Sequence, residues 1–153
     1  MKISVLLPIS NNTEKSYDAI NSILNQTYKN YEILICLNGN SLSFEKKIKK
    51  KYKKIKRIKF FKNKKKNIVP ALNLLIENSK GEYCARIDAD DICKPNRFEE
   101  QVKYLKKNNS KFLSSNCEVI ENKNLSYVHK TDIDRSVYTN QIVHPTIMIK
   151  TKK

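Results

Sequence analysis

The feature that most constrains the fold is an alternation of short apolar blocks with amphipathic segments over the first hundred residues. Apolar blocks typical of strands lie at 3–8, 31–37, 58–61 and 82–87. Apolar residues recur at helical spacing in 16–26, 44–54, 67–78 and the segment that begins at Pro95. Strands that alternate with helices form an open, mostly parallel sheet with helices on both faces. We therefore predict a single α/β domain over residues 1–153.

The loops that follow the predicted strands are the places to look for a ligand. In open parallel sheets, ligands bind in the crevice outside the carboxyl ends of the strands. The corresponding loops here are 8–12, 37–40 and 88–91. Beyond about residue 110 the pattern is less regular, with apolar blocks at 112–120 and 126–128 and a final predicted strand at 142–149.

The chain is strongly basic, with a net charge of +16 and lysine supplying all but four of its 31 basic residues. Proteins that read nucleic-acid sequence rely on arginine for bidentate contacts to bases and phosphates. The lysine-rich stretch 46–66 is interpreted as a solvated helix face, with a lipid- or nucleic-acid-binding patch as the alternative. The charge predicts attraction to anions in general, and no specific nucleic-acid partner.

Nothing in the sequence predicts a membrane span or a zinc site. No apolar run approaches the roughly 18 residues that a spanning helix needs, and Pro8 ends the short apolar stretch at the start. The four cysteines form no CxxC pair, and the two histidines lack zinc-ligand spacing. We expect reduced, mostly buried thiols in a cytoplasmic protein, with peripheral contact to the anionic inner face of the membrane as an option.

Asp88 and Asp90 directly follow a predicted buried strand. A divalent cation that bridges two phosphates takes oxygen ligands and needs only one or two protein carboxylates. Such a cation, Mn²⁺ or Mg²⁺, neutralises charge on a departing diphosphate, so the pair suits sugar transfer from a nucleoside diphosphate. The alternative is an acidic turn that caps the next helix. Asp132 and Asp134 have the same spacing without a preceding apolar strand, so we interpret them as exposed loop charges.

Several ordered blocks of the chain resemble motifs of the family 2 glycosyltransferases, which have a GT-A fold. The blocks are ISVLLPISN at 3–11, SILNQTY at 22–28, EILICLNGN at 32–40, Asn67 with ALN at 71–73, GEYCARIDADD at 81–91, PNRFEEQ at 95–101 and HPTIMIK at 144–150. The resemblance covers nearly the whole chain and implies a GT-A, Rossmann-like sheet. It assigns about 1–110 to the nucleotide-sugar-binding part and about 111–153 to a partial, incomplete acceptor half.

Carried over residue by residue, the resemblance implies roles for particular side chains. The implied nucleotide-sugar contacts are Pro8, Ser10, Asn11, Asn38, Asn67, Asn73, Arg86 and Asp88. The implied metal ligands are Asp88 and Asp90, and the implied acceptor-side residues are Asp91 and His144. Capping of the next helix is the favoured alternative for Asp91, and holding the last strand in place is the alternative for His144.

The chain departs from the family pattern at two places. Where the family has two aspartates near the base, this chain has Leu37 and Asn38, and neither residue offers an acidic contact to uracil or its ribose. The sequence also ends at residues 151–153, before the acidic motif whose aspartate deprotonates the acceptor hydroxyl in the family. No residue of the chain matches that catalytic base, and we expect a chain truncated at its C-terminal side.

Together these observations predict a metal-dependent, inverting glycosyltransferase. The donor would be a nucleoside-diphosphate sugar, with UDP as the nucleotide, and the acceptor a glycan or lipid-linked molecule of polysaccharide assembly. The first alternative is a catalytically impaired remnant that binds the nucleotide sugar without transferring it. A remoter alternative is a basic nucleic-acid-binding module, which leaves the aspartate and HPT blocks unexplained.

Overall fold

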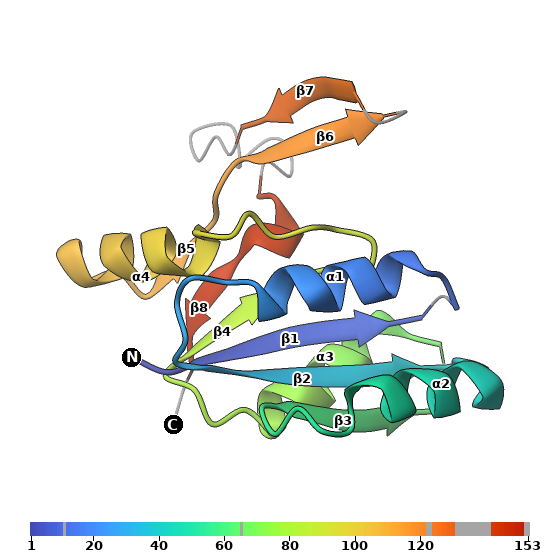
Figure 1. The fold of residues 1–153 in the computed structure, drawn as a ribbon. Helices are drawn as coiled ribbons and strands as arrows, with labels where there is room; N and C mark the ends of the chain where they lie inside the picture. The colour runs from blue at the N-terminus through green and yellow to red at the C-terminus, as the bar shows by residue number, and fades with distance from the viewer. Residues whose placement is uncertain (11, 65, 122–123, 131–141, 152–153) are drawn as a thin grey trace.

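The computed structural model describes residues 1–10, 12–64, 66–121, 124–130 and 142–151. Its main sheet has six strands in the order β3-β2-β1-β4-β8-β5 (Figure 1). The strand bounds are β1 Ile3–Ile9, β2 Tyr31–Asn38, β3 Ile58–Asn63, β4 Tyr83–Arg86, β5 Phe112–Leu113 and β8 Met148–Lys150. The first four strands pair in parallel, whereas β8 is antiparallel to both of its neighbours, β4 and β5. The sheet is therefore mixed and mostly parallel, as predicted.

Helices cover both faces of this sheet because β1 and β2 are apolar on both faces. Helices α1 (Lys15–Leu24), α2 (Leu42–Tyr52) and α4 (Arg97–Lys107) contribute to one core cluster, which contains the odd-numbered residues of both strands. Helix α3 (Ile68–Glu77) packs on the other face, against Leu6, Leu34 and Cys36. Side chains that alternate along a strand point to opposite faces, so a single run of apolar residues supplies both cores.

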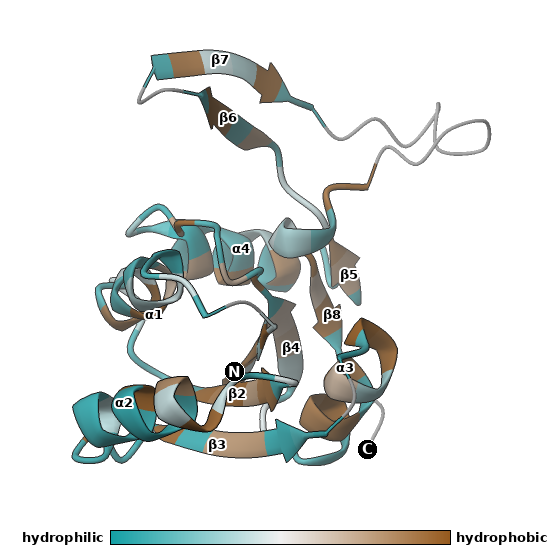
Figure 2. Cartoon of the chain, turned by 90° about the vertical axis from the view of Figure 1, so that its right-hand side faces the viewer, coloured by the Kyte–Doolittle hydropathy of each residue, from teal (hydrophilic) through white to brown (hydrophobic). Residues whose placement is uncertain are grey.

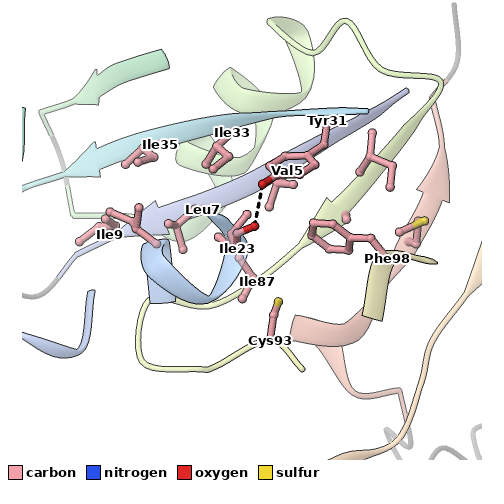
Figure 3. Close-up of a cluster of buried hydrophobic side chains, with 14 of the residues drawn as sticks. Val5, Leu7, Ile9, Ile23, Tyr31, Ile33, Ile35, Ile87, Cys93 and Phe98 are labelled. Carbon is pink, nitrogen blue, oxygen red and sulfur yellow. Dashed lines mark hydrogen bonds between the residues drawn. The ribbon is translucent and has the colours of Figure 1, made fainter. Parts of the chain in front are cut away.

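Aromatic residues join the larger core to the helices above it. Tyr31, at the start of β2, donates a hydrogen bond from its hydroxyl to the carbonyl of Ile23 in α1 at 2.8 Å. Its ring meets Phe98 of α4 edge to face, with 5.8 Å between the centroids (Figure 3). One buried tyrosine thus fixes both helices against the same strand.

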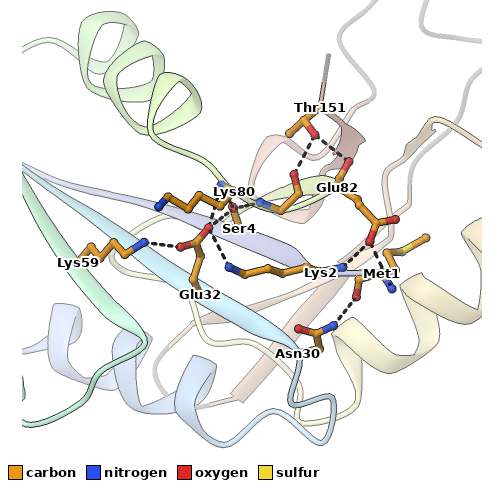
Figure 4. A network of polar contacts seen from close by, with 10 residues as sticks. Met1, Lys2, Ser4, Asn30, Glu32, Lys59, Lys80, Glu82 and Thr151 are labelled. Carbon is orange, nitrogen blue, oxygen red and sulfur yellow. Dashed lines mark hydrogen bonds and ion pairs between the residues drawn. The ribbon is translucent and has the colours of Figure 1, made fainter. Parts of the chain in front are cut away.

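A network of hydrogen bonds around a buried carboxylate lies at the end of the sheet where the parallel strands β1, β2 and β4 begin (Figure 4). Glu32 is 4% exposed and accepts hydrogen bonds from the Ser4 hydroxyl at 2.9 Å, the Lys80 amide at 2.8 Å and the Lys59 ammonium at 2.8 Å. Burial acts to raise the pKa of Glu32, but these hydrogen bonds and the charge of Lys2 hold it below its ordinary value. The network ties the turn before β4 to β1 and β2.

Gly81 belongs to the same turn and leaves no room for a side chain. A Cβ at this position would lie 2.5 Å from the backbone nitrogen of Ser4 and 2.9 Å from the carbonyl oxygen of Lys2. The Gly81 amide donates instead to the Ser4 hydroxyl at 2.8 Å. The close approach of the turn to β1 therefore depends on glycine.

The predicted final strand at 142–149 is wrong over most of its length. A 3₁₀ turn, η1, occupies His144–Thr146, and strand β8 starts only at Met148. The buried hydroxyl of Thr146 donates hydrogen bonds to the carbonyls of Val143 and Ser115, at 2.8 Å each. Pro145 lies in the first turn of η1, where its missing N–H is tolerated. Alternation of apolar residues alone did not indicate this compact turn.

A hairpin formed by β6 (Cys117–Glu121) and β7 (Asn124–His129) stands off from the main sheet (Figures 1 and 2). Its two strands match the less regular blocks that the sequence indicated. The four cysteines are free, and three of them are buried, as expected. Within the described ranges, every helix is too short or too polar to cross a membrane.

Candidate functional site

A pocket of about 190 Å³ opens where β1 and β4 end and α3 begins. Its lining residues are Pro8, Ser10, Thr13, Ile68, Arg86, Asp88, Ala89 and Asp90. Five of the predicted site residues therefore come together from segments that lie almost eighty residues apart in sequence. The position agrees with the rule that ligands bind at the carboxyl ends of parallel strands.

Arg86 and Asp88 form an ion pair inside this pocket. The guanidinium Nε lies 3.0 Å from Oδ1 of Asp88, and Nη2 lies 3.2 Å from Oδ2. Ile87, between them, is 1% exposed, so its neighbours on both sides point the other way, into the pocket. The side chain predicted to flank the nucleotide thus contacts the side chain predicted to face the metal.

Arg86 is itself held by backbone contacts that do not involve its guanidinium. Its carbonyl accepts a hydrogen bond from Nη2 of Arg97 at 2.9 Å, and its amide donates to the Ile147 carbonyl at 3.0 Å. Arg97 comes from α4 and Ile147 from the segment before β8. The end of β4 is therefore fixed from two sides.

The carboxylate loop does not cap helix α4, which overturns the capping alternative for Asp91. The N-cap of α4 is Asn96, whose side chain makes no capping hydrogen bond, and the first-turn amide of Phe98 donates instead to Oε1 of Gln26 at 3.0 Å. The amide of Asp91 instead donates to the Asp88 carbonyl at 3.2 Å, closing a turn. Asp91 is exposed as a residue, but loss of hydration at its carboxyl beside the loop, followed by repulsion from Asp88 and Asp90, raises its pKa. The loop thus concentrates negative charge beside the pocket.

Asn38 and Asn67 hold the neighbouring loops together at the ends of β2 and β3. Asn38 is 2% exposed, and its side-chain oxygen accepts from Nδ2 of Asn63 at 3.0 Å and from the Asn67 amide at 3.2 Å. The Asn67 side chain caps α3 by accepting from the Val69 amide at 3.0 Å. Leu37 is buried in the core. Neither position of the family's acidic pair carries a carboxylate here, because the residues are leucine and asparagine.

Three other predicted residues lie away from the pocket lining or outside the described ranges. Asn73 is exposed on α3 and is not among the lining residues. His144 is exposed at the start of η1, while its neighbour Thr146 is buried and joins the β5–β6 connection. Asn11 falls outside the described residues, as do Asp132 and Asp134.

Some site residues were not predicted from the sequence. Thr13 and Ile68 line the pocket, and the only signal for them was their place just before one helix and at the start of another. Gln101 donates from Nε2 to the Thr146 carbonyl at 2.8 Å. This contact gives the PNRFEEQ and HPTIMIK blocks a shared structural role.

The residues of the pocket fit a divalent cation that takes only one or two of its ligands from the protein. Within the described ranges, no three His, Cys, Asp or Glu side chains gather into a complete metal site. Asp88 and Asp90 nevertheless line one pocket, and a cation that bridges phosphates needs only one or two protein carboxylates. Diphosphate oxygens and water would supply the remaining ligands.

Comparison with protein families matches residues 4–152 to the model described as Glycosyl transferase family 2. An uncharacterized glycosyltransferase of Rickettsia bellii is 33% identical over 96% of this chain. The O-antigen biosynthesis glycosyltransferase WbnJ of Escherichia coli is 31% identical over 97% of it. The chain spans 22% of the first relative's length and 61% of the second's.

Solved structures share the fold at lower identity. Staphylococcus aureus TarS 1–349 in complex with UDP-GlcNAc superposes with a TM-score of 0.80 at 18% identity, over 99% of this chain and 46% of that one. The mannosyltransferase PcManGT of Pyrobaculum calidifontis, in complex with GDP-Man and Mn²⁺, gives 0.68 at 16% identity, over 78% and 36%. These likenesses confirm the predicted fold class.

Proposed function

This chain belongs to glycosyltransferase family 2 and has a GT-A fold, and from that premise we propose that its pocket binds a nucleoside-diphosphate sugar. The nucleotide of the proposal is UDP, and the protein transfers the sugar to a glycan or lipid-linked acceptor with inversion. One observation carries the proposal most directly: Arg86, Asp88 and Asp90 line one pocket at the carboxyl ends of β1 and β4.

The pocket's charged groups suit a diphosphate and a divalent cation. In the proposal, Asp88 and Asp90 hold Mn²⁺ or Mg²⁺, which acts as a Lewis acid on the departing diphosphate. The Arg86 guanidinium presents planar donors that match phosphate oxygens. Pro8 and Ser10 also line the pocket, and in the proposal Asp91 and His144 belong to the acceptor side.

The acceptor hydroxyl requires a base on the face opposite the leaving group, and we assign none. Asp88 and Asp90 are committed to the metal. Glu99 on α4 accepts a hydrogen bond from the Thr27 hydroxyl at 2.6 Å, so it is directed toward the connection between α1 and β2. The alternative of a nucleotide-sugar-binding protein without transfer is therefore tested together with the proposal.

Location at an anionic membrane surface is a further part of the proposal. The exposed lysines of α2 and of the turn after it are Lys46, Lys47, Lys49, Lys50, Lys51, Lys53, Lys54 and Lys56. Lysines separated by four residues on one helix repel each other, and an anionic surface relieves that repulsion. Co-sedimentation with anionic vesicles at low and high salt tests this contact, with neutral vesicles as the control.

Calorimetric titration with UDP, with and without Mn²⁺, tests the donor site. We expect Mn²⁺-dependent binding that Asp90→Asn abolishes and that Asp18→Asn, the same change at an exposed α1 carboxylate, leaves intact. Absence of UDP binding by the folded wild-type chain contradicts the proposal. Salt-sensitive binding to any polyanion without a Mn²⁺ effect supports the nucleic-acid alternative.

Hydrolysis or transfer of a UDP-sugar, followed by chromatography of the released UDP, separates an enzyme from a binding remnant. Turnover that Asp90→Asn removes supports transfer by this chain. Tight UDP binding without turnover, in the presence of candidate glycan acceptors, supports the remnant.

A further inference from the structure

The ion pair between Arg86 and Asp88 affects how a metal ion and a nucleotide bind together. We propose that Arg86 is a positioning residue. Its guanidinium pairs with the Asp88 carboxylate in the free protein and pairs with the diphosphate instead when the donor binds. Metal and nucleotide then bind cooperatively, because the nucleotide removes the cation that competes for Asp88. This inference rests on the proposed donor site.

The backbone places the two side chains next to each other in the free pocket, and their rotamers complete the pair. Arg86 ends β4 and Asp88 follows two residues later, with buried Ile87 between them. Both carboxylate oxygens of Asp88 are engaged, one by Nε and the other by Nη2. Contacts of the Arg86 backbone to Arg97 and Ile147 hold the arginine in register with the aspartate.

The guanidinium opposes metal binding in two ways. It uses the carboxylate oxygens that the metal needs, and it places a positive charge about 3 Å from them. Two cations that share one carboxylate repel each other, and the repulsion is appreciable in a pocket that is partly shielded from water. Of the two carboxylates among the described lining residues, a metal ion that arrives alone therefore finds Asp90 without the guanidinium on it.

A diphosphate reverses this arrangement. Arginine binds phosphate oxygens through the same planar pair of N–H donors that it offers to a carboxylate. The side chain is 23% exposed and lines the pocket, so rotation about its own bonds can bring it to a phosphate. Asp88 is then released to the metal that bridges the same phosphates, and linkage requires each ligand to tighten the other by an equal factor.

Titrations of the whole chain with Mn²⁺ alone and with UDP alone test the proposal. We expect Arg86→Gln to bind Mn²⁺ alone about tenfold more tightly than wild type, because Asp88 is free and one positive charge is gone. The same variant should bind UDP more weakly. Arg86→Lys retains the charge and should return the affinity for Mn²⁺ to within about threefold of wild type.

Lys94→Gln is the matched control, because it removes one positive charge three residues beyond Asp91 and outside the pocket lining. We expect this variant to bind Mn²⁺ as wild type does, and thermal unfolding establishes that every variant folds. Unchanged or weaker Mn²⁺ binding by folded Arg86→Gln, in a protein whose wild type binds UDP with Mn²⁺, overturns the inference alone. Absence of UDP binding by the wild type with Mn²⁺ overturns both the inference and the proposed function.

Discussion

The two ends of the central sheet use carboxylates in opposite ways. At the amino-terminal edge, Glu32 is buried and receives hydrogen bonds from three separate segments. At the carboxyl-terminal edge, Asp88, Asp90 and Asp91 crowd into one loop with a single arginine paired to one of them. The pKa of Glu32 is lowered, whereas that of Asp91 is raised.

This contrast separates stability from binding. A carboxylate whose hydrogen-bonding capacity is filled stabilises the fold, because its charged form is better solvated in the protein than in the unfolded chain. Carboxylates that repel each other are poorly satisfied until a cation arrives. The amino end therefore holds β4 in place, and the carboxyl end retains a repulsion between carboxylates that the proposed metal ion would relieve.

The largest effect is expected from Gly81→Ala at the amino end. The added methyl group would overlap the backbone of β1, so we expect the free energy of unfolding to fall by about 3 kcal/mol in urea titration. Gly39→Ala is the counterpart at the carboxyl end, where φ is +76° and the nearest atom is the Cβ of Lys66 at 3.0 Å. We expect a loss of about 1 kcal/mol there, and equal losses would contradict the contrast.

Glu32→Gln should destabilise the protein by about 2 kcal/mol at pH 7, because charge-assisted hydrogen bonds become neutral ones. The lowered pKa of Glu32 means that its contribution is present above the ordinary glutamate pKa of about 4.3 and is lost as pH falls through the folded-state value. The difference between wild type and variant should therefore shrink in acid. Urea titrations at pH 7 and pH 3 measure it, and a difference that persists unchanged at pH 3 would count against this assignment.

Asp88→Asn is the same chemical change at the other end of the sheet. Its ion pair with Arg86 is partly exposed, so we expect a loss of at most about 1 kcal/mol of unfolding free energy. Mn²⁺-dependent UDP binding should nevertheless weaken strongly, as titration calorimetry can measure. A variant as unstable as Glu32→Gln would show that the carboxyl end also carries the fold.

Asp91→Asn should have the smallest effect and the opposite sign. Its raised pKa means that the ionised carboxylate is unfavourable in the folded state, with stability highest below the ordinary aspartate pKa and falling as pH rises through the folded-state value. Because the side chain is exposed, we expect Asn to stabilise the protein by only about 0.5 kcal/mol at pH 7. Thermal unfolding at pH 7 and pH 4 checks this, since the gain should be smaller at pH 4.

Much of the fold followed from local patterns. Each parallel strand was predicted to within two residues at its ends. The signal was clearest for β1 and β2, which are buried along their whole length and are therefore mostly apolar. The apolar strand that precedes Asp88 and Asp90 distinguished them, as candidate site residues, from Asp132 and Asp134 with the same spacing. That same strand, β4, brings the first pair into the pocket with Pro8 and Ser10.

Other features of the fold and the site could not be predicted, because they depend on contacts between residues or on side-chain conformations that sequence patterns do not specify. Glu32 resembled any charged residue at a strand start, and only the folded chain brings Ser4 and Lys80 to it. The pairing of Arg86 with Asp88 depends on side-chain rotamers inside the pocket, which spacing does not specify. The turn at His144–Thr146 is fixed by Thr146 hydrogen bonds to Ser115, thirty-one residues earlier in the sequence.

The place of β8 in the sheet bears on how the chain folds. Strand β4, which leads into the carboxylate loop, lies between β1 from the start of the chain and β8 from its last described segment. Both of its neighbours are therefore distant in sequence, and sheets assembled from such pairings form slowly. A fragment that stops after α4 would contain every pocket-lining residue yet leave one edge of β4 unpaired. The ability to bind ligand should accordingly appear late in refolding, together with the docking of the final strand.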